Sequence, residues 1–276
     1  MGHGAPAGAA WHTLPTVPRL LTLLTDFGLA DYYVGAVKGT VLRLAPDTQL
    51  VDLSHEVAPG DVEGASDLLA AAAPTFPAGT VHLAVVDPGV GSARRLLVVR
   101  LGDHHFVAPD NGLLTPQLDA GGAAWAVTRR DLFLDDGGAT FHGRDRFAPI
   151  ASALLRGDPP DALGAAIDDA VRLELPAPRR EGSGETWVLR GRVARVDRYG
   201  NLVTNIPGEW VAAGAAPRVV VGEHEVTRWV THYAELPAGE PGALVGSLGT
   251  IELSLRGESF AARWKVRRGA AVTIRT

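Results

Sequence analysis

The sequence predicts an α/β protein in which a first domain with a largely parallel central sheet precedes a smaller antiparallel β-barrel domain. Three observations support this prediction. Up to residue 175, short apolar runs alternate with segments of helical periodicity, which is typical of a sheet covered by helices. Residues 176–184 have the Pro, Gly and charged composition of a linker. Residues 185–276 contain short alternating segments punctuated by Gly and Pro, which favours antiparallel strands.

The first domain, residues 19–175, begins with an apolar run that ends in a polar loop. We expect buried strands wherever such a run stops at a turn, and helices wherever apolar residues recur on one face or Ala and Leu dominate. The expected strands are Leu20–Leu24, Gln49–Leu53, Thr80–Val86, Leu96–Leu101 and His105–Ala108, the last two joined by a turn at Gly102-Asp103. The expected helices cover Asp31–Leu44, Val62–Ala73, Asn111–Ala120 and the segment around Ile150–Leu155.

The second domain is predicted from five short β-rich segments. They are Trp187–Val196, Leu202–Ile206, Arg218–Val221, Ile251–Leu255 and Ala271–Ile274. At the other end of the chain, residues 1–18 are rich in Gly, Ala and Pro and are expected to form a flexible tail without the features of a signal peptide.

Composition excludes several classes of function. The chain has 276 residues and no Cys, so disulfides, Cys-ligated zinc and thiol catalysis are excluded, and a cytoplasmic location is expected. A formal net charge of -5 without a basic stripe argues against nucleic acid as a partner. No apolar run reaches the length of a membrane helix, so no membrane partner is expected.

Polar residues gather in loops next to Gly, where a backbone can approach a ligand closely. Because ligands bind at the carboxyl ends of parallel strands, the loops after the first and third strands should bring Asp26, Asp31 and Asp87 together. Similar loops are Ala108–Gly112, Thr140–Asp145 and Asp197–Asn201.

Each loop also has a plainer interpretation. Asp26 suits the N-cap of the next helix, Asp87-Pro88-Gly89 suits a turn, and His55 and His142 suit structural roles. Gly89-Val90-Gly91 lacks the third Gly of a dinucleotide loop and the Gly-Lys-Ser/Thr of a P-loop. Asp103-His104-His105 is the one hint of a metal phosphoesterase, but its place at a hairpin turn favours exposed surface residues, and no metal site is expected.

The loops taken together are far more specific, and their pattern resembles the S-adenosylmethionine (SAM) hydroxide adenosyltransferase family, whose halogenating relatives are the fluorinase and the chlorinase. The matching segments follow the family order over nearly the whole chain. They are Leu24–Gly28 with Asp31, Tyr33–Gly35 with Lys38-Gly39, Ala84–Gly91, Ala108–Leu114, Thr140–Asp145 and Asp197–Asn201 leading to Thr204-Asn205.

The resemblance implies hydrolysis of SAM to adenosine and L-methionine, with no cofactor besides the substrate. It also implies a homotrimer with active sites between the first domain of one subunit and the second domain of its neighbour. The hydrolytic members of the family carry an Asp, an Arg and a His, and these motif positions are filled here by Asp87, Arg94 and His142. Halogenating relatives have a Tyr at the position of Asp87, and the fluorinase has a Ser at the position of Gly143, so water is the expected nucleophile.

The leaving thioether is neutral and needs no general acid. The reaction therefore requires the protein mainly to position and activate the attacking water. A carboxylate and an imidazole beside one water can orient it and accept its proton, and Arg94 beside Asp87 favours the ionised carboxylate. The sequence does not decide between Asp87 and His142 as the proton acceptor.

The resemblance also assigns the binding residues. Asp26 would accept hydrogen bonds from the ribose hydroxyls, and Asp31 and Asp197 would face the methionine ammonium. Arg256 would bind the methionine carboxylate, although the Ser that the family has beside this Arg is Leu255 here. Tyr199 would stack on adenine, Asn201 would bind its edge, and Phe141 and Gly143 would shape the pocket near C5′. Two alternatives remain: a chlorinase-like halogenase using the same substrate, and a SAM- or adenosine-binding protein without turnover.

Overall fold

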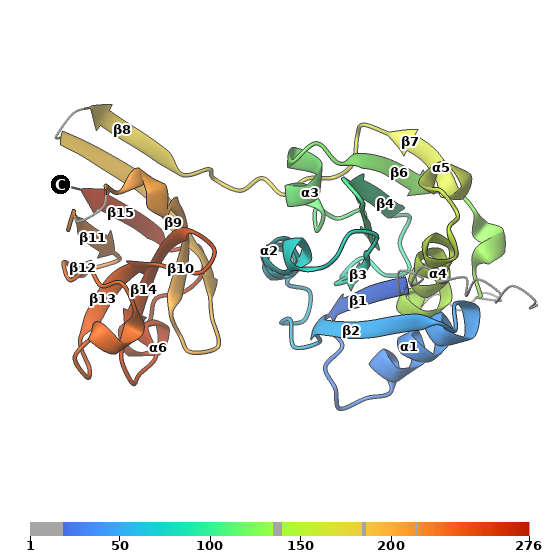
Figure 1. Ribbon diagram of the computed structural model, residues 1–276, viewed down its shortest axis with the longest axis horizontal. Helices are drawn as coiled ribbons and strands as arrows, with labels where there is room; N and C mark the ends of the chain where they lie inside the picture. Colours follow the sequence, from blue (N-terminus) through green and yellow to red (C-terminus); the bar gives the residue numbers. More distant parts are fainter. Residues whose placement is uncertain (1–18, 135–139, 184–185, 213–214, 276) are drawn as a thin grey trace, which may run out of the picture. The chain divides into compact units, whose positions relative to one another are not determined.

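The computed structural model describes residues 19–134, 140–183, 186–212 and 215–275, and the chain divides into two compact units after Arg172 (Figure 1). The tail predicted for residues 1–18 lies outside the described residues. Within the part of the chain that the structure describes, none of the helices is both long and apolar enough to span a bilayer.

The first unit contains a seven-stranded sheet in the order β2-β1-β3-β5-β4-β6-β7. The pairs β1–β2, β1–β3 and β3–β5 are parallel, whereas β4 pairs antiparallel with β5 and β6, and β7 antiparallel with β6. The sheet is therefore mixed, with the parallel strands that the sequence predicts at one side. The strands are β1 Arg19–Thr25, β2 Thr48–Ser54, β3 Val81–Val85, β4 Leu96–Leu101, β5 His104–Pro109, β6 Ala123–Val127 and β7 Gly164–Ile167.

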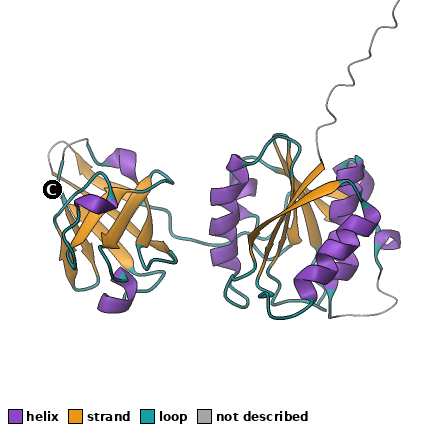
Figure 2. Cartoon of the chain, turned by 60° about the horizontal axis from the view of Figure 1, so that its bottom comes forward, coloured by secondary structure: helices purple, strands orange, loops and turns teal. Residues whose placement is uncertain are grey.

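Helices cover both faces of this sheet, as Figure 2 shows. On one face, Leu21 and Leu23 of β1 belong to the same buried cluster as residues of α1 and α4; on the other, Leu24 packs in a cluster with residues of α2 and α3. The alternation along β1 thus follows from the two-residue period of a strand buried on both faces. The helices are α1 Tyr33–Leu44, α2 Val62–Ala72, α3 Thr115–Asp119, α4 Ala148–Arg156 and α5 Pro160–Leu163, and a π-helical turn over Gly143–Phe147 leads into α4.

The strands β6 and β7 are not predicted from the sequence. Both segments are rich in Ala and lack the alternation that marks a half-buried strand, so only pairing with neighbours in space defines them. Their contact is close: a Cβ on Gly164 would lie 1.9 Å from the carbonyl oxygen of Ala126, so the first residue of β7 must be glycine.

The imidazole of His82 on β3 is fully buried at the opposite end of the strand from Asp87. Its Nδ1 lies 2.8 Å from Thr22 Oγ1, its Nε2 lies 3.1 Å from His104 Nδ1, and its ring stacks on Phe106 at 4.8 Å between centroids. Burial, followed by the neighbouring His104, lowers the pKa of His82 from 6.5 to about 3. His104 is therefore a partly buried partner of this pair, contrary to the exposed position that we expected for it.

Lowering the pH from 7 to 5 is expected to destabilise the first unit through His82. The pKa of His82 is 6.5 in the unfolded chain and about 3 in the folded one. Below pH 6.5 the unfolded chain therefore takes up a proton that the folded protein does not, and stability is lost progressively toward pH 3. By pH 5 the loss amounts to about 2 kcal/mol.

Urea titrations of the wild type and of His82→Gln at both pH values measure this effect. The variant lacks the titrating group, so its free energy of unfolding should fall less between pH 7 and pH 5. Equal pH dependence in the two proteins would show that His82 does not couple folding to protonation.

The second unit is an antiparallel sheet in the order β12-β11-β15-β9-β10-β14-β13, with β8 paired to β9. The two end strands, β12 and β13, contact each other, so the sheet curls into a nearly closed barrel. The elements are β8 Arg179–Ser183, β9 Thr186–Val196, β10 Leu202–Pro207, β11 Arg218–Val221, β12 His224–Val226, β13 Pro241–Val245, β14 Thr250–Leu255, β15 Ala271–Arg275 and the short helix α6 Phe260–Trp264.

Two strands of this unit differ from the others in their residue patterns. We expected residues 176–184 to be a linker, but Arg179–Ser183 form the strand β8. These residues are a strand because they pair with β9 along their whole length. The strand β14 lies between β10 and β13; its Ile251, Leu253 and Leu255 belong to the barrel core, and its Glu252 and Ser254 are buried polar residues at the alternate positions.

Candidate active site

A cavity of about 260 Å³ opens where β1 and β3 end. The two strands are parallel neighbours, so their carboxyl ends carry Asp26 and Asp87 to the same edge of the sheet. The turn before α4 adds Phe141, His142 and Gly143 to the lining. The remaining lining residues are Phe27, Tyr32, Tyr33, Val85, Val90 and Thr140.

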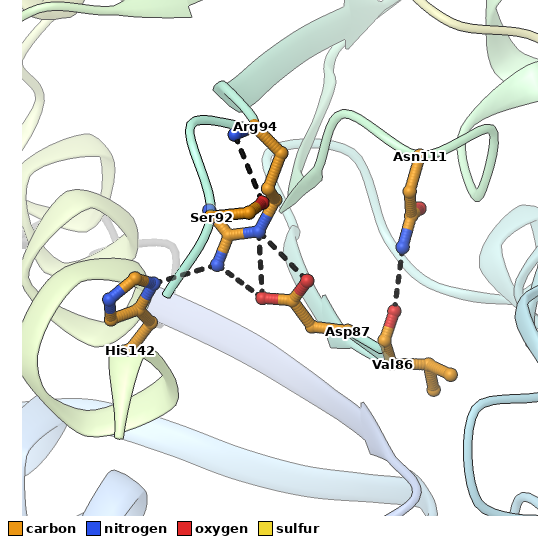
Figure 3. A network of polar contacts seen from close by, with 6 residues as sticks. All are labelled: Val86, Asp87, Ser92, Arg94, Asn111 and His142. Atoms are coloured by element: carbon orange, nitrogen blue, oxygen red, sulfur yellow. Dashed lines mark hydrogen bonds and ion pairs between the residues drawn. The ribbon is translucent and has the colours of Figure 1, made fainter. Parts of the chain in front are cut away.

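A hydrogen-bonded group of Asp87, Arg94 and His142 lies at this cavity (Figure 3). The Nε of Arg94 lies 2.8 Å from each Asp87 carboxylate oxygen, and its Nη2 pairs with Asp87 Oδ2. The same Nη2 lies 2.8 Å from His142 Nδ1. The Asp87 and Arg94 side chains are only 5% and 9% exposed, so water screens this ion pair little.

The contact with Arg94 fixes the tautomer of His142. A guanidinium has five N–H donors and no acceptor, so His142 Nδ1 must accept the hydrogen bond from Arg94. The ring proton of a neutral His142 then lies on Nε2. Arg94 therefore holds a carboxylate and a neutral imidazole in fixed positions with one side chain.

The backbone around this group is held by neighbouring residues. Asn111 donates from Nδ2 to the carbonyl oxygen of Val86, 2.9 Å away, which fixes the residue before Asp87. Arg94 Cζ lies 5.1 Å from the ring centroid of Phe147, the last residue of the π-helical turn that follows His142. Such turns are frequent at functional sites. Asn111 belongs to the Ala108–Gly112 loop, which the sequence singled out without giving it a role.

Four aromatic side chains line the same cavity: Phe27, Tyr32, Tyr33 and Phe141. We call these four residues the aromatic cluster. Tyr33 and Phe141 meet edge to face with centroids 5.1 Å apart, and Tyr32 lies 4.8 Å from Tyr33. Phe27 lies 6.1 Å from both Tyr33 and Phe141. Of these four, the sequence predicted only Phe141 at the site. Tyr33 fits the helical pattern of α1 equally well, and Tyr32 directly precedes that helix.

The two other predicted aspartates of this unit behave differently. Asp26 Oδ2 accepts a hydrogen bond from Gly60 N, 2.8 Å away, and Tyr32 is the N-cap residue of α1, so Asp26 does not cap that helix. Asp31 is exposed, accepts a hydrogen bond from the Tyr32 amide, and is absent from the cavity lining. His55 has a structural role, the plainer of its two interpretations from the sequence. Its ring nitrogens lie 2.8 Å from Thr25 Oγ1 and 3.0 Å from Asp52 Oδ1.

The second unit has a cavity of its own, about 690 Å³ in volume, and the four predicted binding residues of this unit line it. These are Asp197, Tyr199, Asn201 and Arg256, and the other lining residues are Tyr233, Ser254, Leu255, Gly257, Glu258 and Ser259. Tyr199 is 79% exposed, so its ring offers a free aromatic surface to a ligand. Arg256 donates from Nη1 to the carbonyl oxygens of Leu236 at 2.9 Å and Ala234 at 3.2 Å.

Polar contacts order one wall of this cavity. Asp197 Oδ1 accepts from the backbone amides of Tyr199 and Asn201, each 2.9 Å away, and Asp197 Oδ2 accepts from Asn201 Nδ2 at 2.9 Å. Ser254 of β14 donates to Asn201 Oδ1 at 2.7 Å. Gly200 has φ +85°, and a Cβ there would lie 1.9 Å from Ser259 Oγ, so this turn requires glycine.

A second polar pair at this cavity, Tyr233 and Glu252, was not predicted from the sequence. Tyr233 donates its hydroxyl to Glu252 Oε1 at 2.7 Å, and Glu252 is only 5% exposed on β14. Burial raises the pKa of both groups, to about 12 for Tyr233. One signal was present in the sequence: a charged residue in the middle of the apolar segment Ile251–Leu255.

The chemistry available in the first unit is positioning and activation of a small polar reactant. The carboxylate of Asp87 offers acceptors only, and the ring proton of a neutral His142 lies on Nε2. Among residues 19–134, 140–183, 186–212 and 215–275, no group of three or more His, Asp or Glu side chains is arranged to hold a metal ion.

Comparison with known proteins matches both units to one family. Residues 21–164 match the family model of the SAM hydroxide adenosyltransferase N-terminal domain, and residues 191–273 that of the C-terminal domain. An (R)-S-adenosyl-L-methionine hydrolase of Salinispora tropica is 40% identical over 86% of this chain and 90% of its own length. Another (R)-S-adenosyl-L-methionine hydrolase, from Thermus thermophilus, is 37% identical over 93% of this chain and 99% of its own length.

More distant relatives and solved structures agree with this match. A fluorinase of Nocardia brasiliensis is 26% identical over 93% of this chain and 96% of its own. The crystal structure of an uncharacterized conserved protein from Thermotoga maritima aligns with a TM-score of 0.84 and 34% identity, covering 92% of this chain and 99% of that one.

Proposed function

This chain belongs to the SAM hydroxide adenosyltransferase family, and on that premise we propose that it hydrolyses S-adenosyl-L-methionine to adenosine and L-methionine. Relatives named as hydrolases are 35–40% identical to it, whereas the fluorinase relatives are 25–28% identical. The observation that carries the proposal is the buried Asp87–Arg94–His142 group at the first-unit cavity.

The catalytic step that we propose is in-line attack of water on the ribose C5′. The oxygen of water forms a bond to C5′, the C5′–S bond breaks with its electron pair going to sulfur, and methionine leaves as a neutral thioether. The nucleophile loses one proton. Holding water and C5′ in line is worth up to about 7–11 kcal/mol of the barrier in favourable cases.

We assign the proton to Asp87. The Nδ1 lone pair of His142 is occupied by the hydrogen bond from Arg94, so protonating it would break that contact. Asp87 Oδ2 accepts from both Nε and Nη2 of Arg94, but Oδ1 accepts only from Nε and keeps a lone pair for the proton. His142 would line the site of the water, and Arg94 would hold both groups in place.

A halogenase is disfavoured by the same geometry. A halide in the cavity would meet the carboxylate of Asp87, and neither ion has a proton to donate to the other, so no hydrogen bond could hold the halide there. Water has no charge and can donate a hydrogen bond to the same carboxylate.

The binding roles that we propose are distributed over the two units. Asp26, Asp31, Phe141 and Gly143 of the first unit would contact the ribose, the methionine ammonium and the C5′ region. In the second unit, the ammonium would be contacted by Asp197 and the methionine carboxylate by Arg256. Adenine would be contacted by Tyr199 and Asn201. Since neither set is complete alone, we propose that a homotrimer joins the first unit of one subunit to the second unit of its neighbour.

Mixing two inactive variants is expected to restore activity if the sites are shared in this way. In a trimer assembled at random from equal amounts of Asp87→Asn and Arg256→Ala chains, about one quarter of the sites would combine two intact units. The assay is SAM turnover after the two proteins are unfolded together and refolded. Activity no higher than the sum of the two separately refolded variants would contradict a site shared between subunits.

The setting of the reaction can also be inferred from its chemistry. A neutral leaving group needs no general acid or Lewis acid, so we propose catalysis without a metal or cofactor. We place the enzyme in the cytoplasm, because it has no Cys and its proposed substrate is an intracellular metabolite. A net charge of -5 supports small-molecule partners, with neither nucleic acid nor a membrane among them.

Product analysis tests the proposed function. The purified protein is incubated with SAM in the presence and absence of chloride, and the products are separated by chromatography. Adenosine and methionine, formed equally with and without chloride, are the expected result. A 5′-halo-adenosine would identify a halogenase, and unchanged SAM with retained binding would identify a binding protein.

A further inference from the structure

We propose that the aromatic cluster recognises the positive charge of the substrate sulfonium, and that Tyr33 makes the site selective for SAM over the uncharged thioether S-adenosylhomocysteine. This inference rests on the proposed function, since it concerns how the same cavity distinguishes its substrate. It adds a specificity-determining role for Tyr33, which the sequence placed in a segment that matches the family but to which it gave no role.

The first observation is the exposure of the aromatic cluster. Phe27 and Phe141 pack against the buried cluster of the first unit, so the core holds them in place. Tyr32 and Tyr33 are 61% and 38% exposed although they contact these rings. Burial in the core therefore does not account for the two Tyr rings, which lie where a ligand in the cavity would meet them.

The second observation is that a cation already lies on one ring of the cluster. The guanidinium carbon of Arg144 is 5.0 Å from the centroid of Phe141, and Arg144 also pairs with Asp145. The separation is within the range of a cation–π contact, about 6 Å. Rings of this cluster thus provide the kind of surface that attracts positive charge.

The third observation is the chemistry of the other groups at the cavity. A sulfonium has no N–H or O–H, so it cannot form the hydrogen bonds by which carboxylates bind ammonium groups. The charge of Asp87 is compensated by Arg94, and Asp26 is hydrogen-bonded to Gly60 N. Aromatic faces are a surface suited to a cation without donors, as in proteins that bind quaternary ammonium groups.

The contact with the rings would change during the reaction. When the C5′–S bond breaks, the sulfonium becomes a neutral thioether and its attraction to the rings ends. The contact therefore stabilises bound substrate more than bound methionine. Because it is present before the transition state, it should act on the affinity for SAM without increasing kcat.

The experiment compares the affinity for SAM and for S-adenosylhomocysteine by calorimetric titration. All proteins carry Asp87→Asn, so that SAM is not consumed during the titration. Tyr33→Leu is expected to weaken SAM binding about 3- to 30-fold and to change S-adenosylhomocysteine binding less than about twofold, which is within the context dependence of a single contact. Tyr33→Phe keeps the ring and should retain the affinity of the parent for both ligands.

Two results would overturn the inference. Equal weakening for both ligands would mean that Tyr33 only shapes the cavity, and unchanged SAM affinity would mean that its ring does not meet the sulfonium. Failure of the proposed function is seen separately, in a wild type that forms no adenosine from SAM. Thermal unfolding of each variant verifies that loss of affinity does not arise from loss of fold.

Discussion

Replacing Asp87 with Asn is expected to slow SAM turnover by about 10²–10⁴-fold. The amide keeps the size of the carboxylate but removes the charge and the basic oxygen that we propose as proton acceptor. The variant also leaves the buried guanidinium of Arg94 without its counter-charge. Single-turnover kinetics measure the chemical step, and titration with S-adenosylhomocysteine measures binding, which should largely survive.

Asp110→Asn is the matched control for this prediction. Asp110 is also a buried carboxylate paired with an arginine, since its side chain is 3% exposed and Arg95 Nε lies 2.7 Å away, but it is absent from the cavity lining. Both variants remove the charge of a buried carboxylate that pairs with an arginine, so both should lower stability. If the two slow turnover equally, the role of Asp87 is structural.

Replacing Arg94 with Lys is expected to slow turnover by about 10²–10³-fold although the charge is conserved. Arg94 uses Nε and Nη2 to hold Asp87 and His142 together, and its planar fork fixes the angle between these contacts. A lysine ammonium is a single point on a flexible stem and cannot reproduce both. The His142 tautomer would then no longer be fixed, so the pH dependence of turnover should also change.

Arg95→Lys is the control for position and chemistry. Arg95 is the next residue, and its guanidinium likewise contacts two groups, Asp110 and Asp169. Neither partner lines the cavity, so turnover should stay within a few-fold of the wild type. Wild-type turnover in Arg94→Lys would contradict the anchoring role of this guanidinium.

The predictable part of the fold is the part whose signals are local. The strand β1 and the helix α1 were visible in an apolar run and in the spacing of Val37 and Val41, because both patterns follow from burial on known faces. By contrast, β7 is recognisable only through its pairing with β6, and β8 has the composition of a linker. Strands defined by a distant partner carry little local signal.

The same distinction holds for the site. Parallel topology predicts that Asp26, Asp31 and Asp87 come together at one edge of the sheet. Asp26 and Asp87 do line one cavity, whereas Asp31 is exposed and absent from its lining. The tautomer of His142 could not be predicted, because it depends on which nitrogen Arg94 reaches in three dimensions. Glu252 was missed because its partner Tyr233 is 19 residues away, and only the folded barrel brings them together.

The strand β14 has a consequence for how ligand affinity and folding are linked. Its alternate residues fill the barrel core on one side, while Ser254 and Glu252 anchor Asn201 and Tyr233 on the other. A slip of one residue in its pairing would exchange the two sets and destroy the core and the cavity wall together. A ligand of this cavity therefore binds only chains in which β14 is correctly paired, and at 100 times its dissociation constant it would stabilise them by about 2.7 kcal/mol. Ligand-dependent protection of the second unit from proteolysis thus reports the register of a single strand.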